Sequence, residues 1–109
     1  MNAMKLAQYF VVAMPILTAA ISIPLIAKLV PPNGAYGFRT RYAFSSSAAW
    51  YATNKLSGIC LLVASLVALC LMILVVLRRG ISPSTVIWEI VVYSICLFVG
   101  IGMTFALGG

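Results

Sequence analysis

The residues best suited to specific chemistry lie in one polar interval of the chain, residues 31–58. Two arginines in its first half carry planar guanidinium groups, which bind carboxylate or phosphate through paired hydrogen bonds. A tryptophan and an asparagine in its second half are four residues apart, so they share one face of a helix. We take the candidate ligand- or partner-binding residues to be Arg39, Thr40, Arg41, Trp50 and Asn54.

Four further residues of this interval are expected to shape it. Pro32 and Asn33 stand in a Pro-Pro-Asn-Gly sequence that predicts a helix stop and a turn. Gly37 follows in the loop, and Gly58 allows another backbone to approach the helix closely. An alternative interpretation makes the whole interval a folding motif without a ligand. In it the first arginine binds loop carbonyls, the tryptophan packs beneath, and the asparagine bonds across to the loop.

The single acidic residue, Glu89, is the other candidate for chemistry. An ionisable side chain inside a membrane-spanning segment suggests a function, because burying its charge there is costly. A proton- or cation-coupled role is therefore one hypothesis. Pairing with Arg78 or Arg79 is the alternative, since both lie a short distance before it in the sequence.

Other classes of site have little support in the composition. The chain has no histidine, one acidic residue and three cysteines within apolar segments. These residues predict no metal site, since such sites draw on histidine, cysteine and carboxylate ligands together. General acid–base and nucleophilic catalysis also need groups that are missing here. We expect no cofactor and no enzymatic activity.

The basic residues are expected to bind the membrane surface. The net charge is +6, and four of the seven basic residues lie in or beside the polar interval: Lys28, Arg39, Arg41 and Lys55. Three membrane spans would put these four residues and the carboxylate of Gly109 on the same side of the membrane, and that carboxylate is the only anion the sequence offers there. Anionic lipid headgroups attract such residues, so we expect these rather than nucleic acid as partners.

The rest of the chain is apolar enough to require lipid as its solvent. Apolar residues make up 64% of the 109 residues and charged residues 7%. In soluble domains, apolar residues average about 45–50% and charged residues about 25%. A chain this short leaves much of its surface exposed, so water could not surround so many apolar side chains. The composition predicts an integral membrane protein, in which oligomers are possible.

The apolar segments predict one membrane domain, residues 1–109, with three transmembrane helices and one long polar loop. Each segment has the roughly 20 residues that a membrane span needs. Two prolines in the first segment predict a bent helix, whose Thr18 and Ser22 hydroxyls could bind the carbonyls freed at Val11 and Ala20. The predicted elements are helix 1 at about 6–30, the loop at 31–46, helix 2 at about 47–77 and helix 3 at about 85–107.

The loop and the helix that follows it resemble the signature of the SdpI family of small bacterial membrane proteins. The matching residues are Pro32-Asn33, Tyr36-Gly37-Phe38-Arg39-Thr40, Trp50, Asn54 and Gly58. This resemblance implies a multi-pass protein of the bacterial cytoplasmic membrane. It also implies immunity to an antimicrobial peptide toxin, or membrane signalling associated with it, through the interfacial loop.

Two alternatives to this function follow from the residues. A small transporter would use Glu89, although four-span multidrug exporters carry their acid in the first span. A small accessory subunit of a larger membrane complex would use the small-residue faces of the helices to bind partners. A peptide toxin, a membrane protein and the lipid bilayer are therefore the partners to consider.

Overall fold

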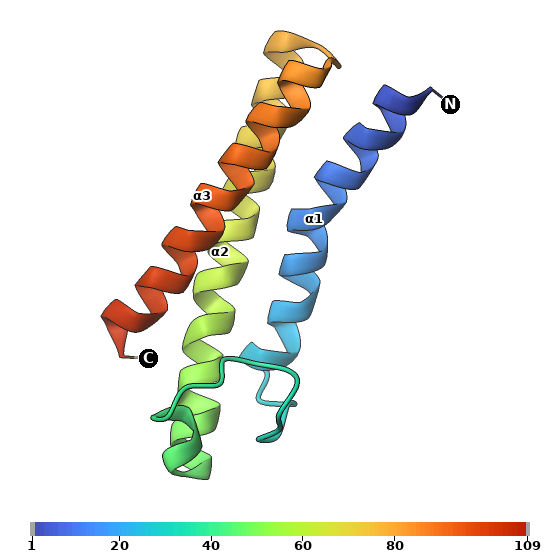
Figure 1. Cartoon of the computed structure of the whole chain (residues 1–109). Helices are drawn as coiled ribbons and strands as arrows, with labels where there is room; N and C mark the ends of the chain where they lie inside the picture. Colours follow the sequence, from blue (N-terminus) through green and yellow to red (C-terminus); the bar gives the residue numbers. More distant parts are fainter. Residues whose placement is uncertain (1, 109) are drawn as a thin grey trace.

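The computed structural model describes residues 2–108 and consists of three long helices (Figure 1). Helix α1 spans Ala3–Ile26, α2 spans Ser47–Arg79 and α3 spans Pro83–Leu107, and a short 3-10 turn, η1, covers Ala43–Ser45 just before α2. Residues 2–108 contain no strand. The prediction of an all-α protein with three membrane-spanning helices and one long polar loop is confirmed.

Each helix is long and apolar enough to cross a membrane. The molecule is 49 Å long, slightly more than the thickness of about 40–45 Å of a bilayer with its headgroups. Large apolar side chains point outward along the helices; Phe10 is 68% exposed and Phe98 is 74% exposed. Because lipid would cover these side chains, the chain is a multi-pass membrane protein.

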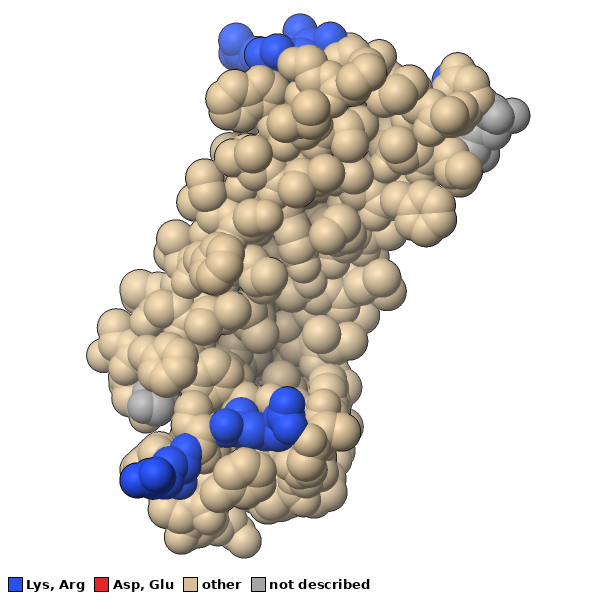
Figure 2. Space-filling model, viewed as in Figure 1, with Lys and Arg blue, Asp and Glu red and all other residues tan. Residues whose placement is uncertain are grey.

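The helices place the two polar regions at opposite ends of the molecule. The beginning of α1 and the α2–α3 connection lie at one end, and the long loop and the end of α3 lie at the other (Figure 1). Figure 2 shows lysine and arginine side chains gathered at these two ends, with uncharged residues between them. This is the distribution that snorkelling to two headgroup layers requires.

Side-chain caps define where the helices begin. Asn2 accepts a hydrogen bond from the Lys5 N–H before α1, at 2.8 Å. Ser46 accepts from the Ala49 N–H before α2, at 3.0 Å. Ser82 caps α3, which begins at Pro83, two residues before the predicted start, because proline is well tolerated in the first turn.

Helix α1 ends at Ile26, four residues before the predicted end. The Leu29 N–H binds the Pro24 carbonyl and the Lys28 N–H binds the Leu25 carbonyl, which is the Schellman arrangement. Lys28 occupies the left-handed position at φ 59° that glycine usually takes. The chain therefore leaves the helix before Pro31 rather than at it.

The hydroxyls beside the prolines of α1 bind other carbonyls than those we predicted. Thr18 donates to the Met14 carbonyl at 2.9 Å, and Ser22 donates to the Thr18 carbonyl at 2.7 Å. Each hydroxyl thus binds the carbonyl four residues before it, which is within reach of a serine or threonine side chain on a helix. The carbonyls of Val11 and Ala20 are not their acceptors.

Small residues set the distances between the helices. A Cβ atom on Gly58 of α2 would lie 2.9 Å from the Ser22 carbonyl oxygen of α1. A Cβ atom on Gly100 of α3 would lie 2.9 Å from the Ala64 Cβ of α2. These glycines therefore allow the close backbone approach typical of helices that pack in membranes.

Candidate interfacial site

The polar interval folds into a compact structure at one end of the molecule, which we call the platform (residues 30–54). Its first turn is organised by Asn33. The Asn33 side chain donates to the Pro31 carbonyl at 2.8 Å and accepts from the N–H groups of Ala35 and Tyr36 at 2.8 and 2.6 Å. Asparagine binds nearby backbone in this way in many turns. The Tyr36 hydroxyl then donates to the Ile21 carbonyl and fastens the turn to α1.

Asn54 of α2 holds the middle of the loop. Its Oδ1 accepts from the Phe38 N–H, and its Nδ2 donates to the carbonyls of Phe38 at 3.3 Å and Trp50 at 2.9 Å. Gly37 passes directly over this amide with φ 111°, and a Cβ atom there would lie 2.7 Å from the Asn54 Oδ1. The Asn54 side chain is 2% exposed, so its amide is fully engaged within the chain.

Trp50 is the apolar centre of the platform. It is fully buried and clusters with Leu25, Val30 and Ala43. Its indole Nε1 donates to the Val30 carbonyl at 2.8 Å, which joins α2 to the chain just after α1. The ring of Phe44 covers it from outside at a centroid distance of 5.2 Å. A buried tryptophan usually needs such a partner for its N–H.

The platform also contacts α3 and ends in a capped turn. The Phe38 ring packs edge-on against Phe105 of α3, with centroids 5.1 Å apart. The Thr40 hydroxyl accepts from the Ala43 N–H at 3.1 Å, which caps η1. Thr40 is therefore engaged with the backbone, as Trp50 and Asn54 are.

The structure divides the five candidate residues into two groups. Trp50, Asn54 and Thr40 are engaged within the platform. Arg39 and Arg41 are exposed. The Arg39 Nη1 donates to the Gly34 carbonyl, which leaves the remaining N–H groups of its guanidinium facing outward.

The outer face of the platform is cationic and aromatic. Lys28 and Lys55, which flank the platform in the sequence, are exposed as the two arginines are, and Figure 2 shows basic side chains at this end. Tyr42 is 55% exposed and Phe44 is 52% exposed. The one acidic side chain lies near the other end of the molecule, and the Gly109 carboxylate lies outside the described residues. The platform thus offers guanidinium forks next to exposed rings.

Glu89 bonds to a glutamine of α1 and not to Arg78 or Arg79. Gln8 of α1 donates from Nε2 to the Glu89 Oε2 at 2.6 Å, and both side chains are buried. Arg79 instead donates to the Ser84 hydroxyl at 2.8 Å, with its guanidinium 5.9 Å from the Trp88 ring centroid. Sequence proximity suggested the arginines, but helix α3 turns the Glu89 side chain toward α1.

Sequence reasoning missed Gln8, although a signal for it exists. Gln8 lies five residues after the start of α1, and Glu89 lies six residues after the start of α3. Both helices start at the same end of the molecule, so the two polar side chains reach similar depths. It missed the contact between Phe38 and Phe105 as well, because an aromatic residue near a membrane interface gives no indication in the sequence of which ring it will contact.

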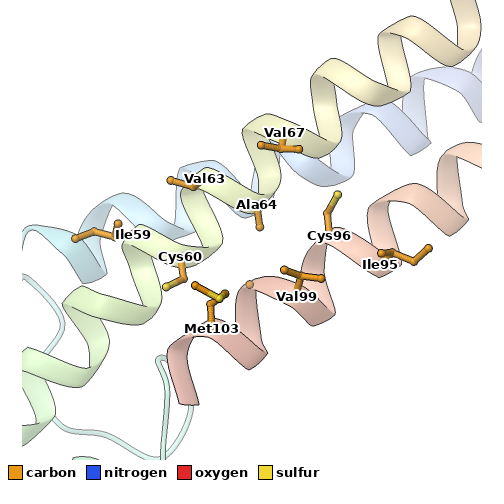
Figure 3. A pocket seen from close by; sticks show the side chains of 10 residues that line it. Ile59, Cys60, Val63, Ala64, Val67, Ile95, Cys96, Val99 and Met103 are labelled. Atoms are coloured by element: carbon orange, nitrogen blue, oxygen red, sulfur yellow. The ribbon is translucent and has the colours of Figure 1, made fainter. Parts of the chain in front are cut away.

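An apolar groove of about 330 Å³ runs between α2 and α3 (Figure 3). Side chains from Ile59 to Val67 line it on α2, and side chains from Ile95 to Met103 line it on α3. Cys60 and Cys96 both reach it and both have free thiols. Within residues 2–108, no group of three histidine, cysteine or acidic side chains could hold a metal ion.

Comparison with known proteins agrees with the resemblance seen in the loop. A model of the SdpI/YfhL protein family matches residues 29–108, which include the whole platform, α2 and α3. Neither the search of curated proteins nor that of solved structures gave a match. The family match covers well over half of the chain, and the chain therefore belongs to the SdpI/YfhL protein family.

Proposed function

We propose that this chain resides in a bacterial cytoplasmic membrane and protects the cell against a membrane-active peptide, which it binds on the outer face of the platform. One observation carries the proposal. The interior side chains of the platform are engaged within the chain, while its cations and two of its rings face outward. Such a surface is held in place before any partner arrives, which lowers the entropic cost of binding.

The chemistry of this face limits the kind of peptide that it would bind. The guanidinium groups of Arg39 and Arg41 suit a carboxylate, and the exposed rings of Tyr42 and Phe44 suit an apolar side chain. A strongly cationic peptide would be repelled by four basic residues with no carboxylate side chain beside them. The expected partner is therefore an apolar peptide with a free carboxylate, such as its C-terminus.

The link to immunity comes from the family. The SdpI resemblance implies immunity to a peptide toxin, and the platform contains every residue of that resemblance except Gly58. The place of the platform at one end of the three helices supports this role, because a membrane-active peptide must pass the headgroup layer before it reaches the spans. Anionic lipid headgroups are the other ligands that these cations would bind.

Survival of a sensitive bacterial strain tests the proposal. Expression of the chain should raise survival under toxin, and Arg41→Gln should reduce that protection at unchanged membrane levels. Arg78→Gln is the matched control, since it removes the same charge from an exposed site at the opposite end. Full protection by the Arg41 variant, or no protection by the parent chain, would contradict the proposal.

Direct binding separates a peptide from lipid. The chain in nanodiscs should bind the toxin with a free C-terminus more tightly than the same peptide amidated there. This difference should persist in discs of purely zwitterionic lipid. A difference that disappears when anionic lipid is omitted would instead identify the headgroups as the ligand.

A further inference from the structure

The Gln8–Glu89 pair is a buried polar site at the other end of the molecule from the platform. Glu89 is 0% exposed and Gln8 is 7% exposed. Glu89 lies six residues inside α3, roughly 9 Å along the helix axis at the standard rise. The site joins α1 to α3, and a second polar link between the two helices follows deeper in the membrane, between Thr18 and Tyr93 at 2.5 Å.

The hydrogen bond between Gln8 and Glu89 engages only one polar atom of each side chain. Gln8 Nε2 donates to Glu89 Oε2, but Glu89 Oε1 and Gln8 Oε1 are both buried and have no hydrogen-bond partner among the described residues. Both atoms are acceptors when the carboxyl group is ionised, so they cannot bond to each other. Hydrocarbon offers no donor to either oxygen, which makes this arrangement costly.

Within residues 2–108, no basic side chain forms an ion pair with Glu89. On α2, Arg78 and Arg79 are exposed, and Arg79 is engaged with Ser84 and Trp88. On α1, Lys5 is exposed, and Gln8 itself is neutral. On α3, the next ionisable side chain is Tyr93, which bonds to Thr18. Among the described residues, an ionised Glu89 would therefore be a buried anion with a single neutral donor.

We propose that Gln8 and Glu89 form a proton-binding site, in which one proton from the adjacent aqueous side rests on Oε1 of Glu89. The carboxylate gains the proton and becomes a neutral acid, with no other bond made or broken. Its O–H can then donate to Gln8 Oε1 while Gln8 Nε2 continues to donate to Glu89 Oε2. An acid and a primary amide close a ring of two hydrogen bonds in this way. One proton thus joins the two unpartnered oxygens in a hydrogen bond.

A metal cation fits this site less well. Hard cations are bound by about six or more oxygen ligands, whereas two unpartnered oxygens are present here. Proton binding would hold the first turns of α1 against α3, because the hydrogen-bonded ring needs Gln8 from α1 and Glu89 from α3. This role is independent of peptide binding at the platform.

Infrared spectroscopy of the whole chain in lipid nanodiscs tests the proposal directly. The sequence has one acidic side chain, so within this chain a protonated carboxyl band can come only from Glu89 or the chain terminus. Carbonyl bands of the lipid esters and the disc scaffold are common to all samples and cancel in the difference between the parent and the Glu89→Gln spectra. At near-neutral pH we expect the C=O stretching band of a protonated carboxyl group, and we expect Glu89→Gln to remove it. Gln8→Leu should shift the band to higher frequency, because the carboxyl group loses its amide partner.

Two results would overturn the proposal. The first is the absence of a protonated carboxyl band from the parent chain at near-neutral pH. This measurement does not depend on any substitution. Carboxylate bands that shift when NaCl replaces a bulky-cation salt at constant pH would assign the site to a metal cation instead. A band that is present in the parent, unaffected by sodium and lost in Glu89→Gln establishes the proton site.

Discussion

The side-chain amide of Asn54 pairs with both backbone polar groups of Phe38, accepting from its N–H and donating to its carbonyl. This pairing substitutes for the backbone partners that a loop residue lacks. Because Asn54 belongs to the rigid helix α2, the pairing fixes the loop at a defined height over the helix. The guanidinium of Arg39, the next residue, is thereby kept at the surface of the platform.

Asn54→Ala should loosen the platform without disturbing the three spans. It leaves the two Phe38 groups unpaired, and a part-buried group without its partner costs about 1–3 kcal/mol. We expect faster tryptic cleavage after Arg39 and Arg41, with unchanged helix content by circular dichroism. Ser47→Ala, at an exposed position of the same helix, is the control. Equal cleavage rates in the two variants would mean that Asn54 does not hold the loop.

Gly37→Ala should destabilise the protein, and Gly34→Ala should not. Gly37 has φ 111° and a new Cβ would lie 2.7 Å from the Asn54 Oδ1, whereas a Cβ on Gly34 has nothing within 4 Å. The backbone strain alone costs roughly 1–3 kcal/mol. Thermal unfolding in detergent measures both variants. Similar unfolding temperatures for the two would show that neither the strain nor the contact exists.

Trp50→Phe isolates the hydrogen bond from the indole to the Val30 carbonyl. The smaller ring keeps most of the apolar contacts but removes the donor, for an expected loss of about 1–3 kcal/mol in the free energy of unfolding. Trp88→Phe is a matched control, because Trp88 is 50% exposed and near the other end of the molecule. The prediction fails if both variants unfold at the temperature of the parent chain.

Gly58→Ala should push α1 away from α2. The added Cβ would meet the Ser22 carbonyl at 2.9 Å and the Ile26 Cγ1 at 2.8 Å. Overpacking of this kind costs typically about 1–3 kcal/mol. Gly102→Ala is the control, since nothing lies within 4 Å of a Cβ there. Thermal unfolding should separate the two variants by several degrees, and equal unfolding temperatures would contradict the close approach of α1 to Gly58.

The local features of the platform were the easier part to predict. A Pro-Pro-Asn-Gly turn, a serine cap and the spacing of Trp50 and Asn54 each depend on residues close in sequence. They indicated a helix beginning near Ser46 and an asparagine turned toward the loop. The end of α1 was harder, because Lys28 takes a left-handed position that sequence rules reserve for glycine.

By itself the sequence determined that lipid surrounds most of this protein, that the chain has three spans, and which family it belongs to. Those properties depend on total apolar content, segment length and a short local signature, all of which can be read along the chain. Only the tertiary structure decided that Trp50 and Asn54 are engaged internally while Arg39 and Arg41 face outward. It also decided that Glu89 meets Gln8, 81 residues away in sequence. Contacts between helices depend on how each helix is rotated about its axis, and uniformly apolar spans carry little pattern to specify that rotation.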